Sequence, residues 1–402
     1  MKLIKNSQKL RIILKRLKYI PWNFICGIFP MNKEIILESN PDMTCNTYKL
    51  FLYMIEHGLN KDYKLTWMVA HPEKFNDLNI ENVSFIPYFP RNYKEKVKQY
   101  IRCNRAAAII CSNRHRAKFC SSSKQLNVFL DHGSQLKRMT TNGNRRIIGC
   151  DYLLCQSKFF IPYNLDQYEV RKDQIFCAGL PRNDFFYENT NTIKKMFIDI
   201  DSFDYTILWV PTFRQHESIV RIDCDFSMPL GLPVLYNEAH VKELNEHLRR
   251  RNVLLVVKPH PAQNMQLIKD MKCSNIRFIV NDDLVAAGIQ TNELLAQTDA
   301  MITDYSSIYY DYLLADKPIA ITLDDYHEYE NQKGFVFSDP LSILKGEYIY
   351  TIDDFITFIN NVADGKDVAK DERNAIRNLV HDYQDGNSSE RVYQFIIEHL
   401  KV

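Results

Sequence analysis

Short apolar runs alternate with amphipathic stretches along the chain from about residue 33 onward. The runs are rich in β-branched residues, which is typical of buried strands, and the stretches between them repeat apolar side chains at helical spacing. This alternation predicts a parallel sheet with helices on its faces. In the first half, strands are expected at 33–39, 64–69, 83–86, 106–111, 126–131, 151–157 and 175–179, and helices at 47–58 and 93–103.

A polar break near residues 187–204 separates this series from a second one. A chain of 402 residues is too long for one ordinary core, so two domains are expected. We expect two Rossmann-like parallel-sheet domains, at 31–190 and 200–375, facing across a cleft, and a C-terminal helix within 376–402. In the second half, strands are expected at 205–211, 252–259, 275–280, 300–304 and 318–323, and helices at 237–251, 291–298 and 389–402.

The first 30 residues differ from the rest. Residues 1–20 carry seven Lys or Arg side chains and no acid, and their apolar residues recur at helical spacing. A basic amphipathic helix of this kind can lie on an anionic membrane surface, whereas its apolar part is too short to span one and no cleavage site follows it. The alternative is a helix that packs on the first domain.

Composition excludes several other classes. The net charge of +2 argues against a general nucleic-acid binder. The ten cysteines show neither a Cys-x-x-Cys pair nor zinc-ligand spacing, which indicates reduced, buried thiols in a cytoplasmic protein and no metal centre. No P-loop, dinucleotide-binding glycine motif or hydrolase nucleophile elbow occurs.

Polar residues directly after strands are the candidate functional residues, because ligands of parallel sheets bind outside the carboxyl ends of the strands. The strand at 126–131 is followed by His132 and Gly133, with Lys137 nearby. An imidazole with a pKa near 6.5 suits proton abstraction at neutral pH, and Lys137 would add positive charge. The alternative is a structural or solvated loop histidine.

Three further strand ends carry basic residues. Arg182 follows 175–179, Thr212 and Arg214 follow 205–211, and Lys258 and His260 stand in the sequence "KPHP" after 252–257. An arginine fork can clamp a phosphate, and a Lys with a His held between prolines makes an anion site. The alternatives are ordinary helix-start and strand-end chemistry.

The stretch "ITDYSSIYYDYLLADKPIAI" at 302–321 places a polar turn between a strand and a helix. Backbone N–H groups and hydroxyls of Ser306 and Ser307 could hold a phosphate at the helix start. Asp311 would accept hydrogen bonds from ribose hydroxyls one turn deeper. Simple capping by Asp304 and Ser306 is the alternative, but it explains neither the second serine nor the inward acid. A nucleotide diphosphate site explains all three.

Taken in order, "LDHGSQLKRM", "CAGLPRND", "ILWVPTFR", "VVKPHP" and "ITDYSSIYYDYLLADKPI" resemble the CDP-glycerol glycerophosphotransferase family of teichoic-acid and related polymer synthesis. The segment "ESNPDMTCNTYKL", with Asn46, is also similar to that family. The resemblance covers roughly residues 33–340 and implies a GT-B fold with no cofactor bound in the protein. It also implies peripheral work at the cytoplasmic face of the membrane on lipid-linked acceptors.

The resemblance carries roles over to matching residues. It implies that His132 is the general base and that His260, with Lys258, faces the diphosphate. It implies phosphate contacts for the arginines at 182 and 214. It also implies nucleotide binding for the turn that carries Ser306 and Ser307 (the serine turn). One departure is Asp131, where the family usually has Trp: Asp131 either orients His132 and raises its basicity or signals a different donor or acceptor.

The expected reaction moves an alditol phosphate, most simply glycerol phosphate from CDP-glycerol, onto a hydroxyl of a membrane-linked saccharide or growing polymer. CMP leaves, and positioning supplies much of the rate. The alternatives are an NDP-sugar glycosyltransferase or UDP-sugar epimerase of the same fold, and a catalytically inactive scaffold of an envelope-polymer assembly complex. The choice of glycerol or ribitol, single addition or polymerisation, and a possible homo-oligomer stay open.

Overall fold

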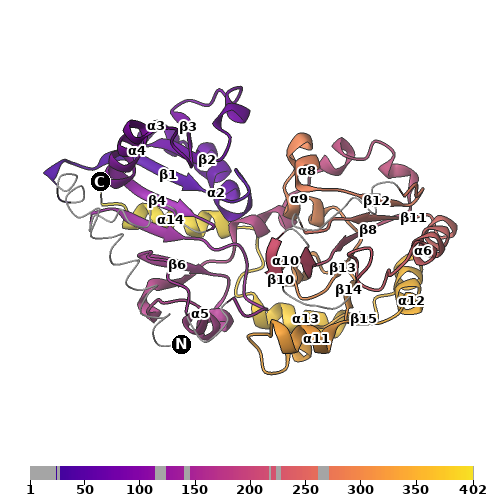
Figure 1. The fold of residues 1–402 in the computed structure, drawn as a ribbon. Helices are drawn as coiled ribbons and strands as arrows, with labels where there is room; N and C mark the ends of the chain where they lie inside the picture. Colours follow the sequence, from indigo (N-terminus) through magenta and orange to yellow (C-terminus); the bar gives the residue numbers. More distant parts are fainter. Residues whose placement is uncertain are drawn as a thin grey trace.

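The computed structural model describes residues 28–113, 124–139, 145–216, 219–222, 228–260 and 271–401, together with Phe24. The predicted basic helix at the N-terminus therefore lies almost wholly outside the described residues. The rest forms two α/β units joined at a waist, with the first half of the chain in one and most of the second half in the other (Figure 1). The two-domain α/β prediction is confirmed.

The N-terminal domain is built on a seven-stranded sheet in the order β3-β2-β1-β4-β5-β6-β7, in which every pair is parallel. Its apolar runs are buried on both faces, as expected for strands that are covered by helices. The strands are β1 Asn32–Glu38, β2 Lys64–Val69, β3 Val83–Pro87, β4 Ala106–Cys111, β5 Leu126–Phe129, β6 Tyr152–Cys155 and β7 Ile175–Cys177.

The C-terminal domain has a six-stranded sheet in the order β12-β11-β8-β13-β14-β15, again parallel throughout. The chain reverses direction across the sheet between β8 and β13, which is a topological switch point of the doubly wound fold. The strands are β8 Tyr205–Val210, β11 Val253–Val257, β12 Ile276–Phe278, β13 Ala300–Thr303, β14 Ile319–Thr322 and β15 Glu347–Ile349; a separate hairpin joins β9 Gln215–His216 to β10 Ile219–Ile222.

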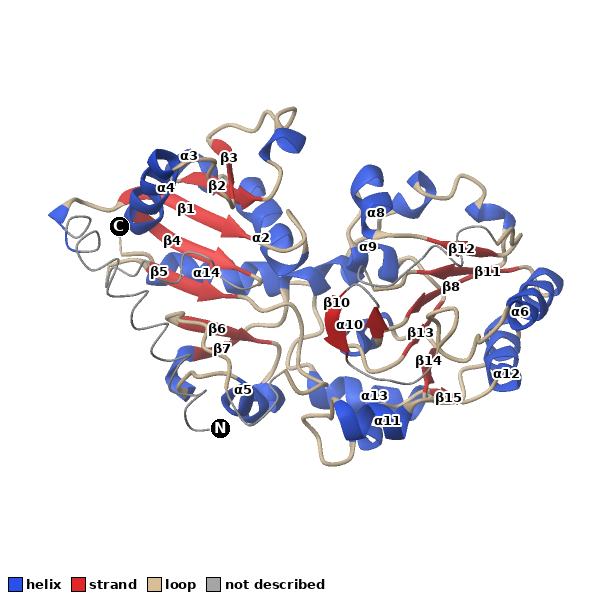
Figure 2. Ribbon diagram, in the orientation of Figure 1, coloured by secondary structure: helices blue, strands red, loops and turns tan. Residues whose placement is uncertain are grey.

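Helices cover both sheets (Figure 2). They are α2 Cys45–Glu56, α3 Leu59–Asp62, α4 Tyr93–Arg105, α5 Ile161–Gln167, α6 Glu238–Arg250, α8 Asn281–Ala287, α9 Thr291–Ala296, α10 Ile308–Tyr312, α11 Tyr326–Gln332, α12 Ile352–Ala363, α13 Lys370–Val380 and α14 Ser388–His399. None of these described helices is long and apolar enough to cross a membrane.

The last helix returns to the first domain. Val392 and Ile396 of α14 are fully buried in the core beneath the N-terminal sheet (Figure 1). Phe395 stacks on Phe176 of β7 with ring centroids 3.9 Å apart. The C-terminal helix therefore crosses from one domain to the other and completes the N-terminal core.

Candidate functional site

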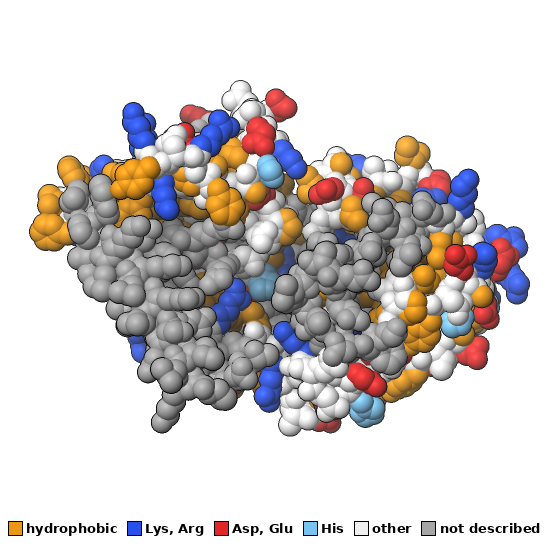
Figure 3. Space-filling model, viewed as in Figure 1, with side chains coloured by type: hydrophobic (Ala, Val, Ile, Leu, Met, Phe, Trp, Pro, Cys, Tyr) orange, Lys and Arg blue, Asp and Glu red, His pale blue; other side chains and the backbone are white. Residues whose placement is uncertain are grey.

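A cleft of about 310 Å³ opens between the two domains and lies beyond the carboxyl ends of their strands. Basic and histidine side chains are visible where the two domains meet (Figure 3). The N-terminal domain contributes Asn40, Pro41, Thr44, Cys45, Asn113, His132, Arg182 and Phe185, and the C-terminal domain contributes Lys258, Asn281, Leu284, Val285, Ile289, Gln290, Thr291, Asn292, Ser306, Ser307, Ile308 and Asp311.

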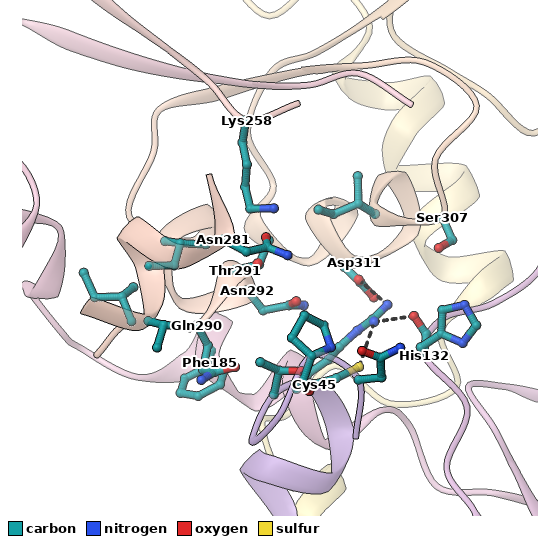
Figure 4. A pocket seen from close by; sticks show the side chains of 18 of the residues that line it. Cys45, His132, Phe185, Lys258, Asn281, Gln290, Thr291, Asn292, Ser307 and Asp311 are labelled. Carbon is teal, nitrogen blue, oxygen red and sulfur yellow. Dashed lines mark hydrogen bonds and ion pairs between the residues drawn. The ribbon is translucent and has the colours of Figure 1, made fainter. Parts of the chain in front are cut away.

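His132 enters this cleft from the turn that follows β5. Its side chain is 46% exposed, and its Nδ1 lies 3.0 Å from Oδ1 of Asp131. The turn is held in place by the buried Asn46 of α2, whose amide donates to the carbonyl oxygens of Leu130 and Asp131 at 3.1 and 3.0 Å. The predicted base thus sits on a fixed backbone with an accessible imidazole (Figure 4).

Gly133 lies where the turn after β5 closely approaches Ser307 of the other domain. A Cβ atom at this position would lie 2.7 Å from Oγ of Ser307 and 2.9 Å from Nη2 of Arg182. Only glycine leaves room for that approach without displacing a neighbour, and its φ of +141° also suits glycine. The turn that carries His132 (the histidine turn) and the serine turn therefore lie against each other.

Arg182 is the second residue of the 3₁₀ turn Pro181–Tyr187, and its side chain bridges the domains. Its Nη2 pairs with Oδ2 of Asp311 at 2.6 Å, and its Nη1 donates to the carbonyl oxygen of His132 and lies 3.3 Å from Cys45 Sγ (Figure 4). Burial opposes its charge, but Asp311 raises the pKa of the guanidinium above its usual range. Arg182 lines the cleft, yet in this structure its charge is paired within the protein.

Asp311 is 1% exposed and ion-paired, which differs from the predicted ribose contact. Burial raises the pKa of its carboxyl, opposed by the neighbouring Arg182. Asp311 belongs to α10, so the pair fixes the serine turn to the N-terminal domain.

Lys258 follows β11 and reaches into the cleft from the C-terminal domain (Figure 4). The residue is 7% exposed, and its ammonium makes no hydrogen bond or ion pair with another described residue. Burial lowers the pKa of its ammonium to about 8. An unpaired buried cation of this kind is costly alone and suits a site that receives an anion.

Ser306 and Ser307 lie in the turn between β13 and α10 and line the cleft. The helix is shorter than expected: α10 continues as a 3₁₀ turn, Leu313–Ala315. Both serines are partly exposed, so their hydroxyls are available to a bound ligand.

Three predicted binding residues lie instead in a buried network behind the serine turn. Arg214 is 3% exposed, pairs with Asp304 and Asp325, and stacks between the rings of Tyr305 and Tyr329. Thr212 donates from both its N–H and its hydroxyl to Oδ2 of Asp304, at 2.8 and 3.0 Å. The sequence could not show that Arg214 pairs with Asp325, because Asp325 comes from a distant loop after β14.

His260 and Lys137 also lie outside the cleft lining. His260 is exposed, and its ring centroid is 5.6 Å from that of Phe213. The backbone of Lys137 forms a β-bridge to Phe335.

The opposite wall of the cleft was missed by the sequence-based reasoning. It comes from α8 and the segment leading into α9, where the apolar Leu284, Val285 and Ile289 stand beside the polar Gln290 and Asn292. The predicted helix at 291–298 was the only feature of the sequence analysis that fell on this wall. Among the described residues no group of three or more His, Cys, Asp or Glu side chains could hold a metal ion.

Two Rossmann-like parallel-sheet domains with a cleft between them define a GT-B-type fold. The chain matches the family described as CDP-Glycerol:Poly(glycerophosphate) glycerophosphotransferase over residues 24–398. It belongs to this family, and it is an enzyme of the CDP-alditol phosphotransferase class. The resemblance seen in the sequence motifs is therefore confirmed.

Relatives agree with this assignment. The chain is 24% identical to a teichoic acid poly(glycerol phosphate) polymerase of Bacillus spizizenii, over 83% of this chain and 84% of that protein. It is 28% identical to a teichoic acid glycerol-phosphate primase of Bacillus subtilis, over 61% of this chain and 57% of the primase. The solved wall teichoic acid polymerase TagF superposes with a TM-score of 0.70 at 17% identity, covering 98% of both chains.

The fold is shared more widely. A putative UDP-N-acetylglucosamine 2-epimerase from Listeria monocytogenes superposes with a TM-score of 0.53 at 12% identity, over 92% of this chain and 96% of the other. This likeness reflects the two-domain architecture alone.

Proposed function

We propose that this enzyme transfers an alditol phosphate, most simply glycerol phosphate from CDP-glycerol, to a hydroxyl of a membrane-linked saccharide or growing teichoic-acid-type polymer. The observation that carries the proposal is one cleft that is lined by the accessible His132 of one domain and by the buried Lys258 and the two serines of the other. A base opposite an anion site is the arrangement that phosphoryl transfer to a hydroxyl needs.

In this mechanism the donor diphosphate binds to Lys258 and the hydroxyls of Ser306 and Ser307. The acceptor oxygen attacks the β-phosphorus, a new O–P bond forms, and the bond to the CMP oxygen breaks. Nε2 of His132 takes the acceptor proton as the bond forms. The fixed cation and hydroxyls stabilise charge on the diphosphate without reorganising during the reaction.

Membrane association belongs to the same proposal, since the acceptor is lipid-linked. The basic N-terminal segment at 1–30 would bring the cleft to the cytoplasmic face of the membrane through anionic lipids. Its removal should lower turnover on vesicle-bound acceptor while leaving donor binding unchanged.

Product analysis tests the function. The full chain is incubated with CDP-glycerol or CDP-ribitol and a lipid-linked saccharide, and the released nucleotide and product mass are determined. Release of CMP with a mass gain of one alditol phosphate per step supports the proposal. Release of a nucleoside diphosphate from an NDP-sugar would identify a glycosyltransferase or epimerase instead. Binding of no CDP-alditol, with co-purification of envelope enzymes, would indicate a scaffold.

A further inference from the structure

Asp131 occupies an unusual position directly before His132. Its backbone has a φ of +52°, its side chain is buried, and the residue is only 4% exposed. The left-handed conformation aims the carboxylate back over its own turn, and aspartate tolerates this conformation better than most residues. A buried carboxylate needs donors, and this one has several.

The two carboxylate oxygens have different partners. Oδ1 accepts the backbone N–H of His132 at 2.8 Å and lies 3.0 Å from Nδ1 of the same residue. Oδ2 accepts the hydroxyl of Tyr168 at 2.7 Å and the amide of Gln135 at 3.2 Å. Although burial opposes ionisation, the neighbouring His132 and Tyr168 lower the pKa of the Asp131 carboxyl.

Turn formation alone does not explain this arrangement. A turn-capping aspartate needs only the backbone contact of Oδ1. Tyr168 comes from the end of α5, is fully buried, and packs edge-on against Phe129 with centroids 6.1 Å apart. A separate element of the fold is therefore used to fix the second oxygen, and with it the direction of the first.

We propose that Asp131 is a positioning residue for the general base: Tyr168 and Gln135 hold its carboxylate so that it keeps the proton of neutral His132 on Nδ1 and leaves Nε2 free for the acceptor hydroxyl. This proposal rests on the proposed function and names a residue that acts through His132. The same carboxylate stabilises the imidazolium that forms when Nε2 takes the proton.

The other charged side chains near His132 include cations, opposite in sign to Asp131. Arg182 donates to the carbonyl oxygen of His132, and Lys258 lines the far side of the cleft. Asp311 neutralises Arg182 through their ion pair. Among the described residues, Asp131 is thus the anion in direct contact with the imidazole.

The first test is NMR on ¹⁵N-histidine-labelled protein, which does not depend on activity. The His132 signal, assigned by its loss in His132→Asn, should show an Nδ1–H tautomer in the wild type. In Asp131→Asn the share of the Nδ1–H tautomer should fall, because the amide can turn its NH₂ group toward Nδ1. Asp184→Asn is the matched control, because Asp184 is also a buried carboxylate but accepts the N–H groups of Ser388 and Ser389.

Kinetics give the second readout. In Asp131→Asn, kcat should fall roughly 10²–10⁴-fold with the KM for CDP-glycerol little changed. Tyr168→Phe should lower kcat in the same way but by less. An unchanged His132 tautomer in Asp131→Asn would overturn the proposal. Absence of CMP release by the wild type, with the tautomer change in Asp131→Asn intact, would instead overturn the proposed function.

Discussion

At the scale of single residues, Lys258 illustrates how the site is prepared for its ligand. Lys258 is buried and its ammonium has no partner among the described residues; it destabilises the unliganded fold, because its folded pKa of about 8 lies below the ordinary value of 10.5. The ammonium is therefore charged below about pH 8 and loses its proton as the pH rises through that value. A bound diphosphate would restore the proton.

Lys258→Met is expected to weaken CDP-glycerol binding roughly 10–100-fold, because a charge-assisted contact is lost. The same change should raise the melting temperature of the free protein, because an uncompensated charge is removed. Isothermal titration calorimetry and thermal unfolding measure the two effects, with the exposed Lys242→Met as control. In the wild type, affinity should fall as the pH rises above about 8, and this fall should be absent in Lys258→Met. Unchanged affinity in the variant would contradict the anion-site assignment.

Variants of Asp311 test whether this residue has a structural role or binds the ligand. Asp311→Asn leaves Arg182 buried without its counterion, which should destabilise the fold by about 3–5 kcal/mol, measured as a lower urea midpoint. The double variant Arg182→Met/Asp311→Leu should recover much of that loss. Normal stability with abolished donor binding would instead support the ribose contact predicted from the sequence.

At the scale of elements, strands and site residues differ in how far the sequence determines them. The expected strands match the observed ones within one or two residues at most ends, because both faces of each parallel sheet are buried and each strand is a continuous apolar run. The histidine turn and the serine turn also line the cleft, because each follows the carboxyl end of a strand in its own sheet. β15 and the β9–β10 hairpin were not predicted, as their runs are short.

The two arginines show where sequence reasoning stops. Arg182 and Arg214 each follow a strand and look equivalent, yet one lines the cleft and the other is buried between Asp304 and Asp325. The difference depends on carboxylates that the fold brings from distant parts of the chain. Local sequence contains no information about these partners.

Arg214→Lys is accordingly expected to destabilise the C-terminal domain by about 3–5 kcal/mol, since one ammonium cannot serve both carboxylates. The folded fraction should bind CDP-glycerol with nearly unchanged affinity, as measured by calorimetry at low temperature. A large loss of affinity without loss of stability would return Arg214 to the phosphate site.

At the scale of the whole molecule, α14 links the domains by completing the N-terminal core from the C-terminal end of the chain. Ile396→Ala should lower the free energy of unfolding by about 2–5 kcal/mol, because a fully buried side chain is removed from that core. The exposed Glu398→Ala on the same helix should have little effect. Equal urea midpoints for the two variants would show that the helix is dispensable for the N-terminal domain.

The central claim is that the base and the diphosphate site face each other across one cleft. A crystal structure of the inactive His132→Asn protein with CDP-glycerol tests it most directly. The account predicts a diphosphate on Lys258 and the serines, placed so that a hydroxyl about 3 Å from the position of Nε2 could reach the β-phosphorus at about 3–3.5 Å. A donor bound with its β-phosphate turned away from residue 132 would contradict it.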